Sequence, residues 1–167
     1  MRRFDPQPVL KGSLLELRPL RADDQDALFA AASDPLIWEQ HPQRNRHEPE
    51  VFRGYFAEQL ASGGALIVLD AQTGEAIGLS RYNGHDAERS EVEIGWTFLV
   101  RRCWGGVYNR ELKDLMLGHA FLSVDSVVCA SATLLSVAVT NAKAASRRCP
   151  KVGEMDCILL LMTDLLT

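Results

Sequence analysis

The chain has 167 residues, of which 47% are hydrophobic and 24% are charged, and its formal net charge is -4. This length suits one domain with a single hydrophobic core, and the composition is that of an ordinary globular protein. The weak negative charge gives no electrostatic reason to expect binding to nucleic acid or to an anionic membrane surface.

No targeting segment, membrane span or metal site is expected. The basic N-terminus is not followed by the apolar core of a signal peptide, and no apolar run reaches the roughly 18 residues of a transmembrane helix. The cysteines show neither CxxC spacing nor histidine partners at metal-ligand spacing: Cys103, Cys129, Cys149 and Cys157. We therefore expect reduced thiols in a cytoplasmic protein, and neither a zinc site nor a disulfide framework.

The first part of the chain predicts a strand and two helices. Residues 14–20 alternate in part between apolar and polar side chains and contain a proline, which is typical of a short strand. Acidic residues then precede an alanine- and leucine-rich run that ends at Asp34-Pro35, so we expect a helix there. Residues 36–46 are expected to be irregular and to lie beside the substrate cleft. A second helix is expected from residue 48 to Ser62-Gly63-Gly64, because its apolar residues recur at three- and four-residue steps.

Three further extended segments are expected: residues 65–70, 75–82 and 89–100. The first two would form a hairpin, and a second polar turn over residues 83–88 would precede the third. A helical period then runs from residue 111 to residue 122, and residues 123–129 have the pattern of another strand. No internal repeat or linker interrupts this order, so we expect one domain.

The stretch of residues 101–111 connects an expected strand to an expected helix. It contains three arginines, Arg101, Arg102 and Arg110, and the pair Gly105-Gly106. A turn of this kind points backbone N–H groups and the positive end of a helix toward an anion. We interpret it as a binding site for the pyrophosphate of a nucleotide-type cofactor. The alternative is a plain strand-to-helix turn whose glycines serve tight packing.

The order of these elements and four short motifs resemble the GCN5-related N-acetyltransferase (GNAT) superfamily, in particular its branch of ribosomal-protein N-terminal acetyltransferases. The resemblance covers about residues 14–128. Its motifs are Leu17-Arg18-Pro19-Leu20, Asp34-Pro35-Leu36-Ile37-Trp38, Glu93-Ile94-Gly95-Trp96 and Trp104-Gly105-Gly106-Val107-Tyr108-Asn109-Arg110-Glu111. It implies an α+β (mixed α/β) three-layer fold, in which helices flank a mostly antiparallel mixed sheet. Residues 1–167 would form one acetyltransferase-like domain with an atypical C-terminal third, residues 129–167.

The resemblance also implies acetyl-CoA as the co-substrate. The turn in this family has the pattern Gln/Arg-x-x-Gly-x-Gly/Ala, and the match here is Arg102, Gly105 and Val107, where valine replaces the usual small residue. The N–H groups of residues 102–107 would bind the pyrophosphate, and pantetheine would pair with the strand edge at residues 97–100. The implied cofactor-binding residues are Phe98, Val100, Arg102, Cys103, Trp104, Gly105, Gly106, Val107 and Asn141.

The implied reaction is direct transfer of acetyl from the thioester to a neutral amine, which requires a proton acceptor. Glu93 occupies the family's glutamate position and is the general-base candidate. A structural carboxylate bonded to a neighbouring strand or loop is the alternative for Glu93, and Glu91, on the same face by alternation, is the second candidate base. Trp38 and His41 are candidates for lining the acceptor pocket, although single aromatic residues more often belong to a core. His119 is expected to be a packed histidine.

The chain departs from the family after Val128. Many members carry an Asn-x-x-Ser motif, a tyrosine and Lys-x-Gly on the helix after the fifth strand. Here Asn141 and Lys151-Val152-Gly153 match, the serine is displaced, and no tyrosine follows Tyr108. An altered or frame-shifted C-terminus is therefore an open hypothesis. If the C-terminus is natural, protonation of the leaving thiolate would come from water, from Tyr108 or from no group.

Two functions follow from this pattern. The first is an active N-acetyltransferase acting on a protein N-terminus or a small amine. The second is a catalytically impaired relative that binds acyl-CoA. The apolar run at residues 158–162 would favour a homodimer if it were exposed.

Overall fold

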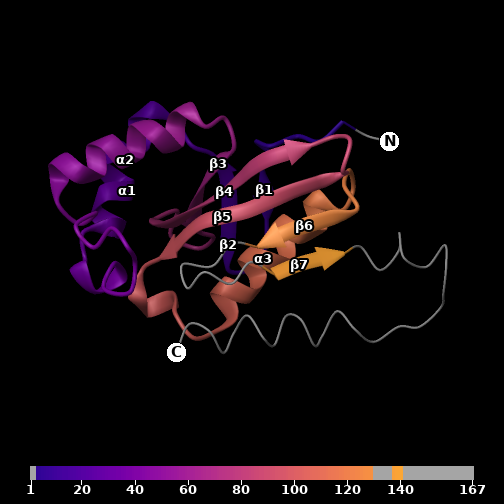
Figure 1. The fold of residues 1–167 in the computed structure, drawn as a ribbon. Helices are drawn as coiled ribbons and strands as arrows, with labels where there is room; N and C mark the ends of the chain where they lie inside the picture. The colour runs from indigo at the N-terminus through magenta and orange to yellow at the C-terminus, as the bar shows by residue number, and fades with distance from the viewer. Residues whose placement is uncertain (1–2, 130–136, 141–167) are drawn as a thin grey trace.

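The computed structural model describes residues 3–129 and 137–140, and these residues form one curved sheet with helices on both faces (Figure 1). The strands are β1 (Leu10–Lys11), β2 (Leu15–Pro19), β3 (Ala65–Asp70), β4 (Ala76–Asp86), β5 (Glu91–Leu99), β6 (Ser126–Cys129) and β7 (Val137–Thr140). The helices are α1 (Gln25–Ala32), α2 (Pro49–Ala61) and α3 (Val107–Ala120), with short 3-10 turns η1 (Ala22–Asp24), η2 (Pro35–Ile37) and η3 (Arg101–Cys103).

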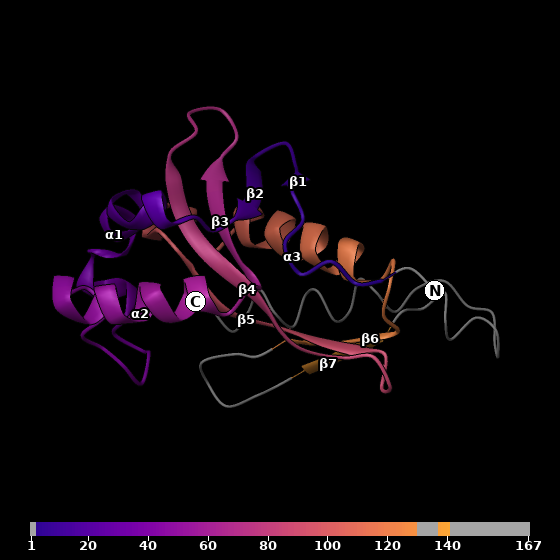
Figure 2. The same cartoon turned by 90° about the horizontal axis from the view of Figure 1, so that it is seen from above.

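The sheet follows the order of the chain, β1 through β7. Neighbouring strands pair antiparallel except β5 and β6, which are parallel and are connected by α3. Seen from above, α1 and α2 lie on one side of the sheet and α3 on the other (Figure 2). The predicted three-layer α+β fold with a mostly antiparallel mixed sheet is confirmed.

Alternating side chains of the central strands supply two separate cores. In β3, Leu66 and Val68 pack in the cluster that includes Leu112 and Met116 of α3. Ile67, between them, packs in the cluster of α1 and α2 residues. This period of two is what a strand buried on both faces requires. It explains why residues 65–70 form an almost continuous apolar run.

Two element boundaries differ from the prediction. Residues 83–86 belong to β4 and not to a polar turn, because Asn83 pairs with Glu93 and Asp86 pairs with Glu91. The reversal itself is short, and the Asp86 carboxylate accepts hydrogen bonds from the backbone N–H groups of Glu88 and Arg89, both at 2.9 Å. The third helix begins at Val107, four residues before the expected start, directly after the glycine pair.

β5 changes its neighbours halfway along its length. Residues 91–94 pair with β6 on one side, while β4 continues alongside β5 to Leu99. The pairing of β4 with β5 shifts register between Leu79 and Arg81, opposite Trp96, whose φ is +53°. A bulge of this kind bends the strand. Within the described residues, β5 beyond Ile94 pairs with β4 alone, so its other edge is open.

Candidate cofactor and active site

The turn between β5 and α3 is built by local hydrogen bonds and one left-handed glycine. The N–H of Cys103 donates to the Val100 carbonyl at 2.9 Å, and the N–H of Trp104 donates to the Arg101 carbonyl at 3.0 Å. Gly105 has φ +63°, a conformation that glycine adopts without strain. The amides of Cys103 and Trp104 are thus used inside the turn. We narrow the predicted pyrophosphate donors to those of residues 105–107.

The N-terminus of α3 fits an anion. Gly106 is the N-cap residue and no side chain caps the helix, and the first turn contains no acidic residue. The first N–H groups of a helix have no intrahelical acceptor and carry its positive end charge. The Val107 side chain is 62% exposed, so the valine found in place of the usual small residue is not packed inside the turn. This donor set suits a pyrophosphate.

The two arginines of the turn form ion pairs with distant acids. Arg101 Nε lies 2.5 Å from an Asp34 carboxylate oxygen, and Arg102 Nη2 lies 2.8 Å from Glu75 Oε2. The hydrogen bond from Arg101 lowers the pKa of the Asp34 carboxyl. These pairs connect the turn to the loop after α1 and to the β3–β4 connection. The Arg102 guanidinium is thus paired with Glu75. The predicted contribution of Arg102 to pyrophosphate binding concerns its backbone N–H and not this side-chain charge.

Near the end of β5, the backbone N–H and C=O groups of successive residues point alternately toward β4 and away from it. Val100 N donates to the Ile77 carbonyl at 2.8 Å, and a Cβ added to Gly78 would lie 2.1 Å from the Phe98 carbonyl oxygen. Phe98 and Val100 therefore direct their backbone groups toward β4. By alternation, Thr97 and Leu99 direct theirs toward the open edge. Within residues 97–100, the range predicted to pair with pantetheine, the outward-facing backbone groups are thus those of Thr97 and Leu99, and those of Phe98 and Val100 face β4.

Trp104 also reaches this edge. Its indole Nε1 donates to the Leu99 carbonyl at 2.8 Å, and the side chain is 45% exposed. Trp104 was predicted as a cofactor-binding residue through its backbone. In the structure its indole donates to the Leu99 carbonyl, at the end of β5 where the open edge reaches the turn.

Glu93 lies at the boundary between the paired and open halves of β5. Its carboxylate accepts a hydrogen bond from Asn83 Nδ2 at 2.9 Å, and its side chain is half-buried. Asn83 Oδ1 in turn accepts from Arg81 Nη2 at 3.3 Å. The hydrogen bond from Asn83 of β4 matches the alternative role for Glu93, a structural carboxylate bonded to a neighbouring strand. Glu91 is also half-buried, two residues nearer the start of β5.

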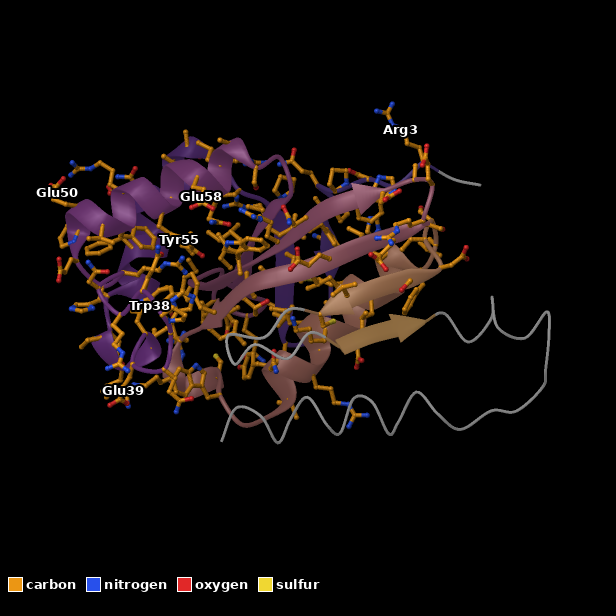
Figure 3. The ribbon with its side chains drawn as sticks, in the orientation of Figure 1. Arg3, Trp38, Glu39, Glu50, Tyr55 and Glu58 are labelled. Carbon is orange, nitrogen blue, oxygen red and sulfur yellow. The ribbon has the colours of Figure 1, made fainter. Side chains whose placement is uncertain are left out.

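A buried guanidinium supports this region from the α2 side of the sheet. Arg81 is 6% exposed and stacks on the Trp96 ring, with its Cζ 3.4 Å from the ring centroid. Its Nη1 donates to Gln59 Oε1 at 3.2 Å and lies 3.6 Å from Glu58 Oε1. Figure 3 labels Glu58 and Tyr55, which belong to α2 at the upper left of the view. This network depends on the bulge at Trp96, which no residue spacing in the sequence predicts.

The two candidate acceptor residues have different surroundings. Trp38 is 2% exposed, donates from Nε1 to the Ala32 carbonyl at 2.8 Å, and packs against Phe98 with ring centroids 5.1 Å apart. Its ring has almost no surface left for an acceptor. His41 is half-buried, with Nε2 3.3 Å from Arg46 Nη1. Burial and the Arg46 charge both lower the pKa of His41.

Glu111 is a structural residue that sequence reasoning missed. Its carboxylate accepts hydrogen bonds from Ser13 N and Oγ at 2.8 and 2.6 Å, from Leu14 N at 2.8 Å and from Leu15 N at 3.0 Å. Burial alone would raise the pKa of Glu111, and these bonds outweigh that effect and lower it. Glu111 therefore connects α3 to the β1–β2 turn. His119, the predicted packed histidine, bonds through Nε2 to the Asp5 carbonyl at 2.8 Å and lies 5.8 Å from the Phe4 ring.

Several expectations concern residues beyond the described ranges. Asn141, Cys149, Cys157, residues 158–162 and the Lys151-Val152-Gly153 segment lie outside them. Of the described cysteines, Cys103 and Cys129 are free and buried. Residues 3–129 and 137–140 contain no group of three or more histidine, cysteine, aspartate or glutamate side chains placed to hold a metal ion. In the same ranges, no helix has the length and apolar character needed to cross a membrane.

A model of the acetyltransferase (GNAT) domain matches residues 15–149, which is most of the chain. The chain belongs to the GNAT acetyltransferase family. The predicted superfamily is thus confirmed, and the match continues past Val128, where the motif resemblance ends. Among curated proteins, none matches the chain.

Solved structures of acetyltransferases share the fold. A GCN5-related N-acetyltransferase from Brucella melitensis aligns with a TM-score of 0.61 and 20% identity over 73% of this chain and 59% of that protein. This chain therefore spans less than two thirds of that relative. Spermidine N-acetyltransferase from Vibrio cholerae, in complex with CoA and spermine, aligns with a TM-score of 0.55 and 17% identity over 71% of each chain. RimJ from Mycobacterium smegmatis, in complex with CoA-disulfide, aligns with a TM-score of 0.56 and 18% identity over 73% and 65%.

Proposed function

We propose that this protein transfers an acetyl group from acetyl-CoA directly to a primary amine, carried by a small molecule or by a protein N-terminus. The observation that supports this most strongly is the junction of β5, the glycine turn and α3. There an uncapped helix N-terminus adjoins a strand edge that is open within the described residues. One end provides donors for a pyrophosphate, and the other provides backbone groups for an extended arm.

The residues that would hold acetyl-CoA are those whose backbone groups face this junction. The N–H groups of residues 105–107 would bind the pyrophosphate, and Thr97 and Leu99 would pair with the pantetheine arm. Bound acetyl-CoA supplies an acyl thioester. An arm paired with the open edge would carry the thioester along β5, toward Trp96 and Glu93.

In the proposed mechanism, Glu93 accepts the proton that the acceptor amine loses, either directly or through a water molecule. Asn83 holds the Glu93 carboxylate by one hydrogen bond and leaves its other oxygen without a partner among the described residues. Glu91 remains the second candidate base. Water or Tyr108 would protonate the departing thiolate.

The acceptor is proposed only as an amine. The net charge of -4 is compatible with a cationic acceptor. His41, which lies beside Arg46 in the loop before α2, remains the candidate for its lining. We propose a cytoplasmic location, because the sequence contains neither a signal-peptide pattern nor a transmembrane run. We also propose a homodimer, because the apolar run at residues 158–162 would favour one if it were exposed.

A second function, acyl-CoA binding without catalysis, is favoured by one observation. Glu93 is bonded to Asn83 as a structural carboxylate would be. The same fold would then bind the thioester and lack an efficient proton acceptor.

One experiment separates the two functions. Acetyl-CoA is titrated into the full chain by calorimetry, and release of CoA thiol is then followed with a panel of amines that includes a polyamine, an aminoglycoside and short peptides. The proposed enzyme binds acetyl-CoA and releases thiol with at least one amine. Binding without release on any amine supports the second function, and the absence of binding contradicts both.

A further inference from the structure

A buried lysine lies beside the open edge of β5. Lys113, on α3, is 8% exposed, and its Nζ donates a hydrogen bond to Thr97 Oγ1 at 3.2 Å. Thr97 Oγ1 also lies 2.7 Å from Ser80 Oγ. None of the ion pairs found among the described residues involves Lys113. A buried ammonium without a carboxylate partner is rare, because burial disfavours its charge.

The environment of Lys113 favours the neutral amine. Burial is the largest influence and lowers its pKa, while nearby Cys129 opposes this effect. A neutral lysine amine is a nucleophile, whereas the ammonium is not. The Thr97 hydroxyl oxygen accepts one N–H, which leaves the nitrogen lone pair to point elsewhere.

Lys113 lies close to the path proposed for the pantetheine arm. Strand β5 and helix α3 converge on the glycine turn, so distances along both elements can be counted from it. Lys113 lies about 9 Å along the helix axis from Val107, at 1.5 Å per residue. Thr97 lies about 10 Å along the strand from Val100. The hydrogen bond between Lys113 and Thr97 thus joins α3 and β5 at similar distances from the glycine turn. An arm that starts at the turn and follows the open edge passes it.

We propose that Lys113 is a site of self-acetylation by bound acetyl-CoA, an inference that rests on the proposed function. Its Nζ attacks the thioester carbonyl carbon, and the C–N bond forms as the C–S bond breaks. The proton that Nζ loses passes to the leaving sulfur, so the products are Nζ-acetyl-lysine and CoA thiol. The neutral amide suits a buried position better than an ammonium does. Acetylation of Lys113 would also place an acyl group beside the edge that the pantetheine arm uses.

The test is peptide mapping by mass spectrometry after incubation of the full chain with acetyl-CoA. Lys11 is the internal control, because its side chain is 71% exposed and pairs with Glu16 at the surface. Parallel samples contain acetyl phosphate, which donates acetyl without the CoA handle, or acetyl-CoA with excess CoA as competitor. Calorimetry on the same preparation measures acetyl-CoA binding. The variants Lys113→Arg and Lys11→Arg are compared, with their thermal unfolding recorded to establish folding.

We expect acetyl-CoA to modify Lys113 at least about tenfold faster than Lys11, because a bound thioester has a high effective concentration. Excess CoA should suppress this preference, acetyl phosphate should not reproduce it, and Lys113→Arg should remove the modification while Lys11→Arg retains it. Binding of acetyl-CoA without faster modification of Lys113 overturns this inference alone. Equal modification by acetyl phosphate also overturns it. Absence of binding overturns both this inference and the proposed function.

Discussion

The two halves of β5 differ in their neighbours, although both are strand by hydrogen bonding. Residues 91–94 lie between β4 and β6, whereas residues 95–99 pair with β4 only, within the described residues. The first half is interior structure, since strands on both sides satisfy its backbone groups. In the second half, the backbone groups that face away from β4 have no strand partner among the described residues. The bulge at Trp96 lies near the boundary between the two halves, and Glu93 lies just before that boundary.

The largest expected effect tests whether catalysis belongs at this boundary. Glu93→Gln should lower kcat by about 10²- to 10⁴-fold, the usual contribution of a general base. Glu91→Gln changes the second candidate base, two residues away on the same strand, and should alter kcat less than about threefold if Glu93 is the base. Steady-state thiol release with the best amine measures both. Equal losses in the two variants, together with lower stability, would assign Glu93 a structural role instead.

A second change tests the strand contact that holds the open half in place. Gly78→Ala puts a Cβ 2.1 Å from the Phe98 carbonyl oxygen, so β4 and β5 must separate. We expect the free energy of unfolding to fall by about 3 kcal/mol, in the range of severe steric changes. Urea unfolding measures it. Gly54→Ala, in α2 with no atom within 4 Å of the new Cβ, should be neutral or stabilising. Similar destabilisation by both would show that the close approach is not what matters.

Glu111 tests the link between α3 and the N-terminal strands, away from the open edge. Glu111→Ala removes an acceptor from four hydrogen bonds, so we expect a loss of about 2 kcal/mol in unfolding free energy. Glu50→Ala, which loses one exposed pair with Arg53, should lose less than about 0.5 kcal/mol.

The pH dependence gives an independent check on Glu111. The pKa of Glu111 is lower in the folded chain than in the unfolded chain. Its stabilising contribution is therefore complete above the unfolded pKa, about 4.3 for glutamate, and is lost as the pH falls from there through the lower folded pKa. The stability difference between the parent chain and Glu111→Ala should shrink over that window. A difference that stays constant down to pH 3 would rule out the charged carboxylate as the source.

The smallest expected effect concerns the α3 N-terminus. Gly106→Glu adds a negative charge where the pyrophosphate is proposed to bind, and the new Cβ has room, with the Trp104 carbonyl oxygen at 3.8 Å. We expect acetyl-CoA to bind about tenfold more weakly, a change of about 1.4 kcal/mol. Gly54→Glu adds the same charge on α2 and should leave the affinity unchanged. Calorimetric titration compares the two, and equal affinities would remove the pyrophosphate from this helix end.

Local patterns predicted much of this fold. The apolar run in residues 65–70 and the helical period in residues 48–61 correspond to β3 and α2, because β3 is buried on both faces and α2 on one. The polar end of β4 was missed, since Asn83 to Asp86 carry side chains typical of turns. The early start of α3 was missed because residues 107–110 have no apolar period to mark them.

The site could be predicted only in part. Its turn has a local motif, so residues 102–107 could be named in advance, but the hydrogen bonds that occupy the amides of Cys103 and Trp104 could not. Which backbone groups of β5 face outward depends on the register with β4 and the bulge at Trp96, so the sequence could not separate Thr97 and Leu99 from Phe98 and Val100 within the predicted range 97–100. Glu111 and Lys113 act through contacts with residues distant in the chain, Ser13 and Thr97 respectively. No spacing in the sequence encodes those contacts.

Amide hydrogen exchange, resolved by residue, with and without acetyl-CoA tests the central claim most directly. Bound acetyl-CoA should slow exchange at Thr97 and Leu99 and at residues 105–107, while the amides of residues 91–94 exchange as before. Binding measured by calorimetry without protection at the open half of β5, or with equal protection of both halves, would contradict the account.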